Sequence, residues 1–157
     1  MDSDQEKQAL ITSLRLLAAS PKSRRGLQKK LEAKGYAREI IEKTLIRLEQ
    51  QGVVNDQMFA QDLFQNLSAR RFSGRKRIAF EMERRGVGTA TVRELLEGYK
   101  PEEERAKAFE VARLKRERWM RLDKPKRRKR IYDFLVRRGF DFSLSKEVTD
   151  EIERNDK

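Results

Sequence analysis

The side chains whose types and spacing could do chemistry in this sequence are cations, arranged around three glycines. The chain can be aligned on itself at Gly35, Gly86 and Gly139, which are 51 and 53 residues apart. At eleven, ten and one positions before these glycines, the three copies carry Arg24, Arg75 and Arg128, then Arg25, Lys76 and Lys129, then Lys34, Arg85 and Arg138. Repeated cations of this kind can bind phosphate groups or the carboxylates of a partner protein.

The first two sets of cations fall at the predicted N-termini of helices, where positive charge is unfavourable. The helix macrodipole makes a cation there cost about 0.3–1 kcal/mol, whereas phosphate is favoured at the same place. A penalty repeated in three copies indicates a function for these residues, although tolerated, solvated charge also explains it. The cations one position before each glycine have a simpler explanation, because the last turn of a helix favours positive charge.

The residues that most enzymes use for catalysis are absent or scattered. The 157 residues include no Cys and no His, which excludes disulfides, thiolate nucleophiles, zinc–thiolate sites and Ser-His-Asp hydrolysis. The phosphate-binding P-loop motif is also missing. A metal-dependent nuclease would need clustered carboxylates, but Asp123 and Asp133 are isolated, and Glu102–Glu104 fit the start of a helix. We therefore predict that the protein is not an enzyme and holds no metal or cofactor.

The elements that carry the cations are short amphipathic helices, one before each of the three glycines. Apolar residues recur eight and four positions before the glycine and directly after it. In the three copies these residues are Leu27, Leu31 and Tyr36, then Ile78, Met82 and Val87, then Ile131, Leu135 and Phe140. The pattern predicts a helix closed by a glycine C-cap, with the following apolar residue folding back onto the last turn.

Each of these middle helices is flanked by two further periodic segments, so the chain is predicted to be all-α. The expected fold is an elongated, curved array of three tandem three-helix repeats, over residues 1–54, 55–100 and 101–157. The first helix of the third repeat is expected to reach Leu122, and Val53–Val54 to form a turn. A single globular helical domain with basic tails is the alternative.

Positive charge is spread along the whole chain. Lys and Arg number 38 against 26 Asp and Glu, which gives a net charge of +12 and a pI of about 10.2. Such a surface favours phosphate or acidic partners. Binding of single strands by base stacking would need exposed aromatic side chains among the cations, and only Phe72, Trp119 and Tyr132 are candidates. The middle helices carry few Asn or Gln residues, so base-specific recognition is not expected.

Segments that could enter a membrane are absent from the sequence. The longest apolar stretch, Leu10–Ala19, contains Arg15 and is too short to span a bilayer. The first residues, Met1–Gln8, carry acidic side chains, unlike a signal peptide. These features predict a cytoplasmic protein that does not bind membranes.

Four segments of the chain follow the signatures of one known family, in the order that the family has them. The first repeat's signature corresponds to residues 23–36, SRRGLQKKLEAKGY, and the junction after it to residues 52–60, GVVNDQMFA. The second and third repeats correspond to residues 70–87, RRFSGRKRIAFEMERRGV, and 125–140, PKRRKRIYDFLVRRGF. On these residues the chain resembles the RecX family, regulatory proteins of the RecA recombinase, over nearly its whole length.

Three positions depart from the RecX pattern. Gly26 stands where the family usually has Glu, which loosens the first turn of that helix. Phe72 replaces a common Gly and Arg75 replaces a common Pro. These two changes concern the loop before the second middle helix.

The resemblance implies a function as well as a fold. A RecX-like protein lodges along the helical groove of the RecA filament on single-stranded DNA. There it inhibits ATP hydrolysis and strand exchange and limits filament growth, and so modulates DNA repair and recombination and the SOS response. The protein would act as a monomer, facing the acidic recombinase and the DNA backbone. The alternative is a free-standing, non-specific single-stranded nucleic-acid-binding protein.

The residues expected to contact the partner or phosphate follow from the charge pattern and not from the family. They are the cations at and just before the predicted N-termini of the middle helices. They comprise Arg24, Arg25, Arg70, Arg71, Arg75, Lys76, Arg77, Arg128, Lys129 and Arg130.

Overall fold

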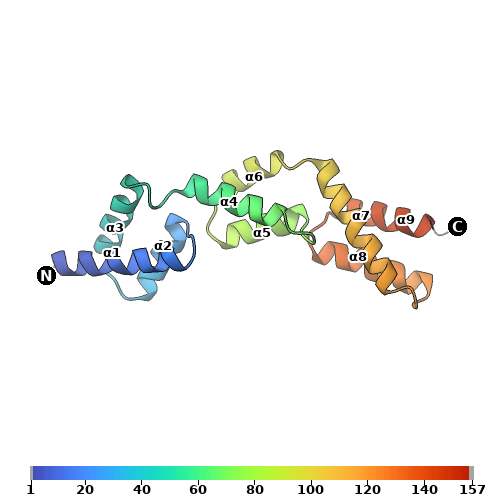
Figure 1. Ribbon diagram of the computed structural model, residues 1–157, viewed down its shortest axis with the longest axis horizontal. Coiled ribbons are helices and arrows are strands. Elements are labelled where there is room, and N and C mark those ends of the chain that lie inside the picture. The colour runs from blue at the N-terminus through green and yellow to red at the C-terminus, as the bar shows by residue number, and fades with distance from the viewer. Residues whose placement is uncertain (1, 156–157) are drawn as a thin grey trace. The chain divides into compact units, whose positions relative to one another are not determined.

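The computed structural model describes residues 2–155, which form nine α-helices (Figure 1). In chain order the helices are α1 (Asp2–Ala19), α2 (Arg24–Ala33), α3 (Arg38–Gln50), α4 (Asp56–Ser68), α5 (Arg75–Arg84), α6 (Thr89–Glu97), α7 (Pro101–Arg118), α8 (Lys124–Arg137) and α9 (Phe142–Arg154). The described part of the chain contains no strand. This confirms the prediction of an all-α chain built from three consecutive three-helix repeats.

The described residues fall into two compact units and not into one globular domain. Unit 1 holds the residues up to 63 together with 82–89, and unit 2 holds residues 64–81 together with those from 90 onwards. Helices α1, α2 and α3 belong to unit 1, and α7, α8 and α9 to unit 2. The helices of the middle repeat, α4, α5 and α6, each contribute residues to both units.

The bounds expected for the three repeats, 1–54, 55–100 and 101–157, remain a prediction. Residues 1, 156 and 157, at the outer ends of the first and last repeat, lie outside the described residues.

Each unit has a core made by the apolar stripes of its helices. In unit 1, helices α1, α2 and α3 pack on one another around Leu27 and Leu31, which are fully buried. In unit 2, helices α7, α8 and α9 pack around Ile131, Leu135 and Phe140. These are the residues eight and four positions before the glycines and directly after one. The sequence pattern therefore identified the core-facing positions of α2 and α8.

The glycines after the middle helices form the predicted C-caps. Gly35, Gly86 and Gly139 have φ angles of 86°, 91° and 87°, in the left-handed region that favours glycine. The residue after each glycine donates its backbone N–H to a carbonyl of the last turn, from Tyr36 to Leu31 at 3.3 Å, from Val87 to Met82 at 3.1 Å and from Phe140 to Leu135 at 3.1 Å. This is the hydrogen bond of a Schellman motif, and it confirms the predicted fold-back.

Two further predictions concerned the Val53–Val54 turn, which is confirmed, and the end of α7, which was placed wrongly. Val53–Val54 forms a turn, as expected, in which both backbone N–H groups donate to the carbonyl of Leu48. The α7 helix ends at Arg118 and not at Leu122. The backbone N–H of Trp119 donates to two carbonyls of the last turn, which tightens the chain and ends the helix there.

In unit 2, the start of α5 lies directly against the turn that follows α8. The backbone N–H of Gly74 donates to the carbonyl of Arg138 at 2.9 Å, and that of Lys76 donates to the carbonyl of Gly139 at 3.0 Å. A Cβ atom on Gly74 would lie 2.4 Å from the carbonyl carbon of Gly139. Only glycine therefore allows the two backbone segments to approach so closely.

In unit 1, the start of α2 meets the turn that follows α5 in an equivalent way. The hydroxyl of Ser23 donates to the carbonyl of Arg85 at 3.2 Å. A Cβ atom on Gly86 would lie 2.6 Å from the same hydroxyl oxygen. The first residues of one middle helix thus pack on the glycine turn of the next, once in each unit.

Candidate interaction surface

The arginine eleven positions before the glycine holds its own unit together in the first repeat. Arg24 forms ion pairs of 2.5 Å with both Glu42 and Glu49 of α3. Its backbone N–H donates to the carboxylate of Asp56 at 2.7 Å. Burial opposes the charged form, but the hydrogen bond to Glu42 and the nearby carboxylates raise the pKa of Arg24 above its ordinary value. Three carboxylates therefore offset the cost of a cation at this helix N-terminus.

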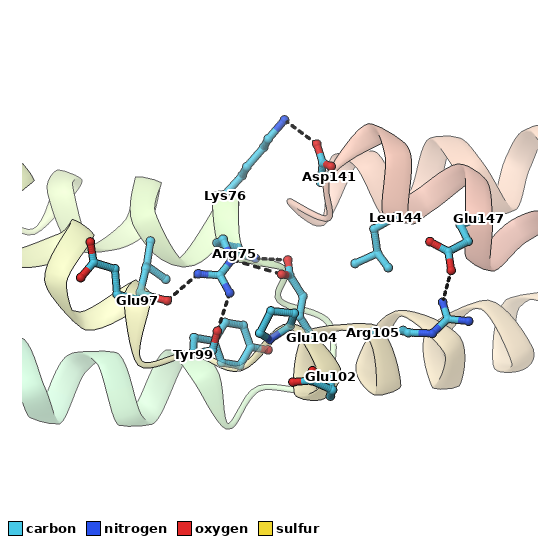
Figure 2. A pocket seen from close by; sticks show the side chains of 12 residues that line it. Arg75, Lys76, Glu97, Tyr99, Glu102, Glu104, Arg105, Asp141, Leu144 and Glu147 are labelled. Atoms are coloured by element: carbon cyan, nitrogen blue, oxygen red, sulfur yellow. Dashed lines mark hydrogen bonds and ion pairs between the residues drawn. The ribbon is translucent and has the colours of Figure 1, made fainter.

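The equivalent arginine of the second repeat, Arg75, joins α5 to the link between α6 and α7 (Figure 2). Its backbone N–H and Nε donate to the carboxylate of Glu104 at 2.9 and 3.2 Å. Its Nη atoms donate to the carbonyls of Leu96 and Tyr99 at 2.5 Å each. The sequence reading missed this role of Glu104, which is buried and was interpreted only as a favourable first-turn charge.

In the third repeat the equivalent arginine is partnered, and its neighbour is buried. Arg128 and Lys129 do not lie at the helix N-terminus as predicted, because α8 already begins at Lys124 with Pro125 in its first turn. Arg128 forms an ion pair with Asp150. Arg127 forms a two-pronged ion pair with Glu153, at 2.8 and 2.7 Å, and both side chains are buried. The sequence reading missed Arg127 as a functional candidate. A signal was present, because Arg127 lies four residues before Ile131 on the apolar stripe of α8.

Two more of the predicted contact residues have acidic partners. Arg71 pairs with Glu110 of α7 at 2.8 Å. Lys76 lies 3.6 Å from a carboxylate oxygen of Asp141, and its Nζ is 4.5 Å from the centre of the Phe142 ring (Figure 2 shows the Asp141 contact). These exposed pairs are weak, because water screens them.

The other predicted contact residues have no carboxylate partner within the described part of the chain. They are Arg25, Arg70, Arg77, Lys129 and Arg130. Of these, Arg130 lies over the Trp119 ring, with 5.9 Å between its Cζ atom and the ring centre. Their charges are therefore available to a partner.

In unit 2 the structure brings some of these cations together with others that the sequence reading left out. We define the unit 2 basic cluster as Arg70, Arg77, Lys115, Arg118 and Arg138. Burial lowers the pKa of Arg138, and the positive charges of Arg77 and Arg70 lower it further. Burial also lowers the pKa of Lys115, followed by the charges of Arg118 and Arg138. The members of the cluster thus repel one another, and an anionic partner would relieve that repulsion.

Aromatic side chains lie beside the unit 2 basic cluster. The rings of Phe72 and Trp119 each make an edge-to-face contact with Phe134, at centroid distances of 6.2 and 6.3 Å. The Nζ of Lys115 lies 4.3 Å from the centre of the Phe134 ring. Phe72, which replaces a common Gly of the family pattern, is therefore part of the packing of unit 2. The backbone carbonyl of Phe72 also accepts a hydrogen bond of 2.7 Å from Nε of Arg138.

These aromatic residues are poorly placed as a free stacking platform. Phe72 and Trp119 are half-buried against the unit 2 core, and Lys115 covers them. The third expected stacking residue, Tyr132, is half-buried beside Arg128 and Lys129. A stacked base would need to displace a cation, so contact with phosphates or carboxylates fits this surface better than base stacking.

A cleft of about 810 Å³ in unit 2 has more acidic than basic residues in its lining (Figure 2). Its carboxylates are those of Glu97, Glu102, Glu104, Asp141 and Glu147. Its three cations already have partners. Arg75 pairs with Glu104, Arg105 with Glu147 at 3.0 Å, and Lys76 with Asp141 at 3.6 Å. This cleft therefore does not suit a phosphate group.

Two further kinds of site are absent from the described residues, a cluster of metal ligands and a membrane-spanning helix. No three or more acidic side chains come together there in a way that could hold a metal ion. None of the described helices has the length and apolar character that crossing a bilayer requires.

Comparison with known proteins gives a consistent picture. Residues 9–48 match the model of the first three-helix domain of RecX, and residues 102–149 match that of the third. A protein of Chlorobium phaeobacteroides named "Regulatory protein RecX" is 31% identical over 150 residues, covering 96% of this chain and 97% of the relative. A protein of the same name from Mycobacterium leprae is 32% identical over 140 residues, covering 88% and 81%.

A solved structure has the same fold. The crystal structure of RecX from Lactobacillus salivarius superposes with a TM-score of 0.84 at 16% identity. The superposition covers 97% of this chain and 99% of that chain.

Proposed function

The chain belongs to the RecX family of regulatory proteins, and from this premise we propose that it binds the RecA recombinase filament on single-stranded DNA. In doing so it inhibits the recombinase's ATPase activity, strand exchange and filament growth, and so modulates DNA repair, recombination and the SOS response. It acts in the cytoplasm as a monomer, without a cofactor and without catalysing a reaction itself.

The unit 2 basic cluster is the observation that carries this proposal. Its five cations come from the turn after α4, from α5, from α7 and from the turn after α8. Burial and the neighbouring positive charges lower the pKa of two of them, Arg138 and Lys115. A group of like charges held this close costs free energy in the isolated protein and gains it when an anionic surface is bound. The acidic side chains of a recombinase and the phosphates of its DNA are surfaces of this kind.

The ten predicted contact residues divide into two groups in this proposal. The unpaired cations Arg25, Arg70, Arg77, Lys129 and Arg130 make direct contact with the filament, and the exposed Arg71 and Lys76 exchange their weak pairs for it. Arg24, Arg75 and Arg128 contribute by holding the middle helices to their neighbours, because each is tied to carboxylates of its own unit.

The experiment that tests the proposal compares the filament with naked DNA at physiological salt. The hydrolysis of ATP by RecA on single-stranded DNA is followed while this protein is added, and its binding to the same DNA is measured without RecA. We expect inhibition at amounts well below one molecule per recombinase, together with weak binding to naked DNA.

A free-standing single-stranded nucleic-acid-binding protein is the second candidate, because the phosphates of naked DNA are also an anionic surface for the unit 2 basic cluster. In that case inhibition would appear only when the protein saturates the DNA, by competition for phosphates. That result would reject the filament proposal in favour of this alternative.

A further inference from the structure

A pocket in unit 1 gathers three cations that lie outside the unit 2 basic cluster. It has a volume of about 400 Å³ and lies where the start of α2 meets the turn after α5. We call it the α2–α5 pocket, and define it by Lys22, Ser23, Gly26, Lys30, Phe59 and Arg85. No carboxylate lines this pocket, in contrast to the acidic cleft of Figure 2.

Ser23 brings the parts of the pocket together. Its hydroxyl accepts a hydrogen bond of 3.0 Å from the backbone N–H of Gly26, which caps α2, and donates to the carbonyl of Arg85. The second bond holds Arg85 beside the first turn of α2. Lys30 follows Gly26 by four residues, so it lies on the same face of the helix.

Lys22 supplies the third positive charge of the pocket, and hydrogen bonds hold its ammonium group in place. Its Nζ donates to the carbonyls of Leu16 and Ser20 at 3.0 Å each, which closes the C-terminal end of α1. Burial lowers the pKa of Lys22, and the charges of Lys30 and Arg85 lower it further. The three cations therefore repel one another with no carboxylate between them.

Two of the three cations are free to bind a ligand. The side chains of Lys30 and Arg85 form no hydrogen bond or ion pair within the part of the chain that the structure describes. Both are exposed at the mouth of the pocket. Gly26 also lines the pocket, and because it has no side chain it leaves room for a ligand above the first turn of α2.

We propose that the α2–α5 pocket binds a phosphate group, with Lys30 and Arg85 as its ligands. Phosphate carries the negative charge that three converging cations require, and the first turn of α2 supplies a favourable dipole in addition. Phe59 gives the pocket an apolar side, against which the sugar or base of a nucleotide can lie. The phosphate comes from the backbone of a DNA strand or from a free anion.

The site is tested by nuclear magnetic resonance on the full chain, titrated in one arm with inorganic phosphate and in the other with an oligo-dT strand. We expect shifts of the backbone amide signals of Ser23, Gly26 and Lys30. Shifts with inorganic phosphate support a site for a free anion, and shifts with oligo-dT alone support a site for the DNA backbone. Shifts confined to other parts of the chain, or no shifts in either arm, overturn the proposal.

Matched variants separate the pocket from general positive charge. The double substitution Lys30→Gln with Arg85→Gln should weaken the binding of whichever probe shifts the pocket signals, inorganic phosphate or oligo-dT, by about tenfold or more. The reason is that hydrogen bonds between charged groups are lost. Lys29→Gln with Lys34→Gln removes the same charge from two exposed positions outside the pocket, one in α2 and one at its C-cap, and should change the affinity far less. Equal losses in both double variants would overturn the proposal, because binding would then depend on net charge alone.

A further variant, Gly26→Glu, should abolish phosphate binding without unfolding the protein. Gly26→Glu places a carboxylate three residues after the N-cap Ser23, where it favours the helix by forming a capping box. It also supplies the pocket with a negative charge of its own. We therefore expect a folded protein with lost phosphate binding, and retained binding would contradict the assignment.

The inference rests on the proposed function only for its connection to the recombinase. If the protein fails to inhibit RecA but its pocket still binds phosphate, the proposed function fails and the site remains. If it inhibits RecA but shows no phosphate-dependent shifts, the site fails and the proposed function remains.

Discussion

Arg127 and Glu153 form an ion pair whose side chains are only 7% and 2% exposed. The two hydrogen bonds are parallel, and Nη1 of Arg127 also donates to the carbonyl of Leu122 at 3.2 Å. The effect of such a buried pair on stability is clearest when one of its two side chains is removed. Removing one partner leaves a buried charge that water cannot reach.

Arg127→Leu should therefore lower the free energy of unfolding by about 3–5 kcal/mol, because the Glu153 carboxylate is left buried and unpaired. Chemical denaturation followed by circular dichroism measures this change. The matched control is Arg128→Gln, which breaks the more exposed pair with Asp150 and should cost no more than about 1 kcal/mol. Equal costs for the two variants would contradict the structural role of Arg127.

Tyr99 links stability to pH at the alkaline end. Burial raises the pKa of its hydroxyl to about 12, and the charges of Glu104 and Glu103 act in the same direction. Because the folded-state pKa lies above the ordinary value of 10.0, the protonated form stabilises the fold below about pH 10. That contribution should be lost as the pH rises from about 10 to about 12.

Tyr99→Phe should remove this part of the pH dependence. The hydroxyl is buried and has no hydrogen-bond partner among the described residues, so its deletion should not destabilise the protein at neutral pH. Denaturation curves of both proteins across this pH range measure the difference. Parallel curves for the two proteins would show that Tyr99 does not titrate as described.

At this scale the sequence located the cations but not their partners. Of the three arginines that the alignment placed at helix N-termini, Arg24 and Arg75 are the first residues of α2 and α5, whereas Arg128 lies in the second turn of α8. All three have carboxylate partners. Those carboxylates lie 18 to 29 residues away along the chain. Which acid meets which arginine depends on helix packing, and a charge pattern does not contain that information.

At the scale of elements, the contact between α5 and the turn after α8 restricts position 74 of unit 2 to glycine. A Cβ atom on Gly74 would overlap the backbone of Gly139 and Phe140 at 2.4 Å. Backbone atoms cannot give way as a flexible side chain does, so the two elements would have to move apart.

Gly74→Ala should therefore lower the free energy of unfolding by about 1–3 kcal/mol. Hydrogen exchange should show reduced protection of the amides of Gly74 and Lys76, because their bonds to the α8 turn would be broken. Gly88→Ala is the control, since a Cβ there would meet nothing within 4 Å. A Gly74→Ala protein as stable as this control would contradict the close approach.

The elements show what a sequence can and cannot predict. The middle helices and their caps follow from local rules, namely apolar residues four apart and a glycine with positive φ, and these were predicted correctly. The end of α7 was placed four residues too late, because Leu122 continues an apolar pattern that the turn at Trp119 interrupts. The contact of Gly74 with Gly139 joins residues that are distant in the chain, so no local sequence pattern predicts it.

At the scale of the whole molecule, the net charge of +12 resolves into charges with different roles. Some cations hold helices together, as Arg24 and Arg127 do. Others gather without acids, in the unit 2 basic cluster and in the α2–α5 pocket. The sequence indicated the excess charge, but the membership of Lys115 and Arg118 in the cluster follows only from the packing of α7 against α8.

Binding through unpaired cations should be sensitive to salt. Each phosphate contact on a single strand contributes a slope of about −0.7 to the logarithm of affinity against the logarithm of salt concentration. Arg70→Gln with Arg77→Gln should make this slope shallower for DNA coated with recombinase, as measured by fluorescence anisotropy of the labelled strand. An unchanged slope would exclude these two residues from phosphate contact.

The most direct test of the central claim is the ATPase rate of RecA filaments on single-stranded DNA, measured against increasing amounts of three proteins. These are the wild type, the double variant Arg70→Glu with Arg77→Glu, and Arg93→Glu, which reverses an exposed charge on α6 outside the cluster. We predict that the wild type and Arg93→Glu inhibit alike, and that the double variant requires about tenfold more protein or more. Full inhibition by the double variant, or none by the wild type, would contradict the claim.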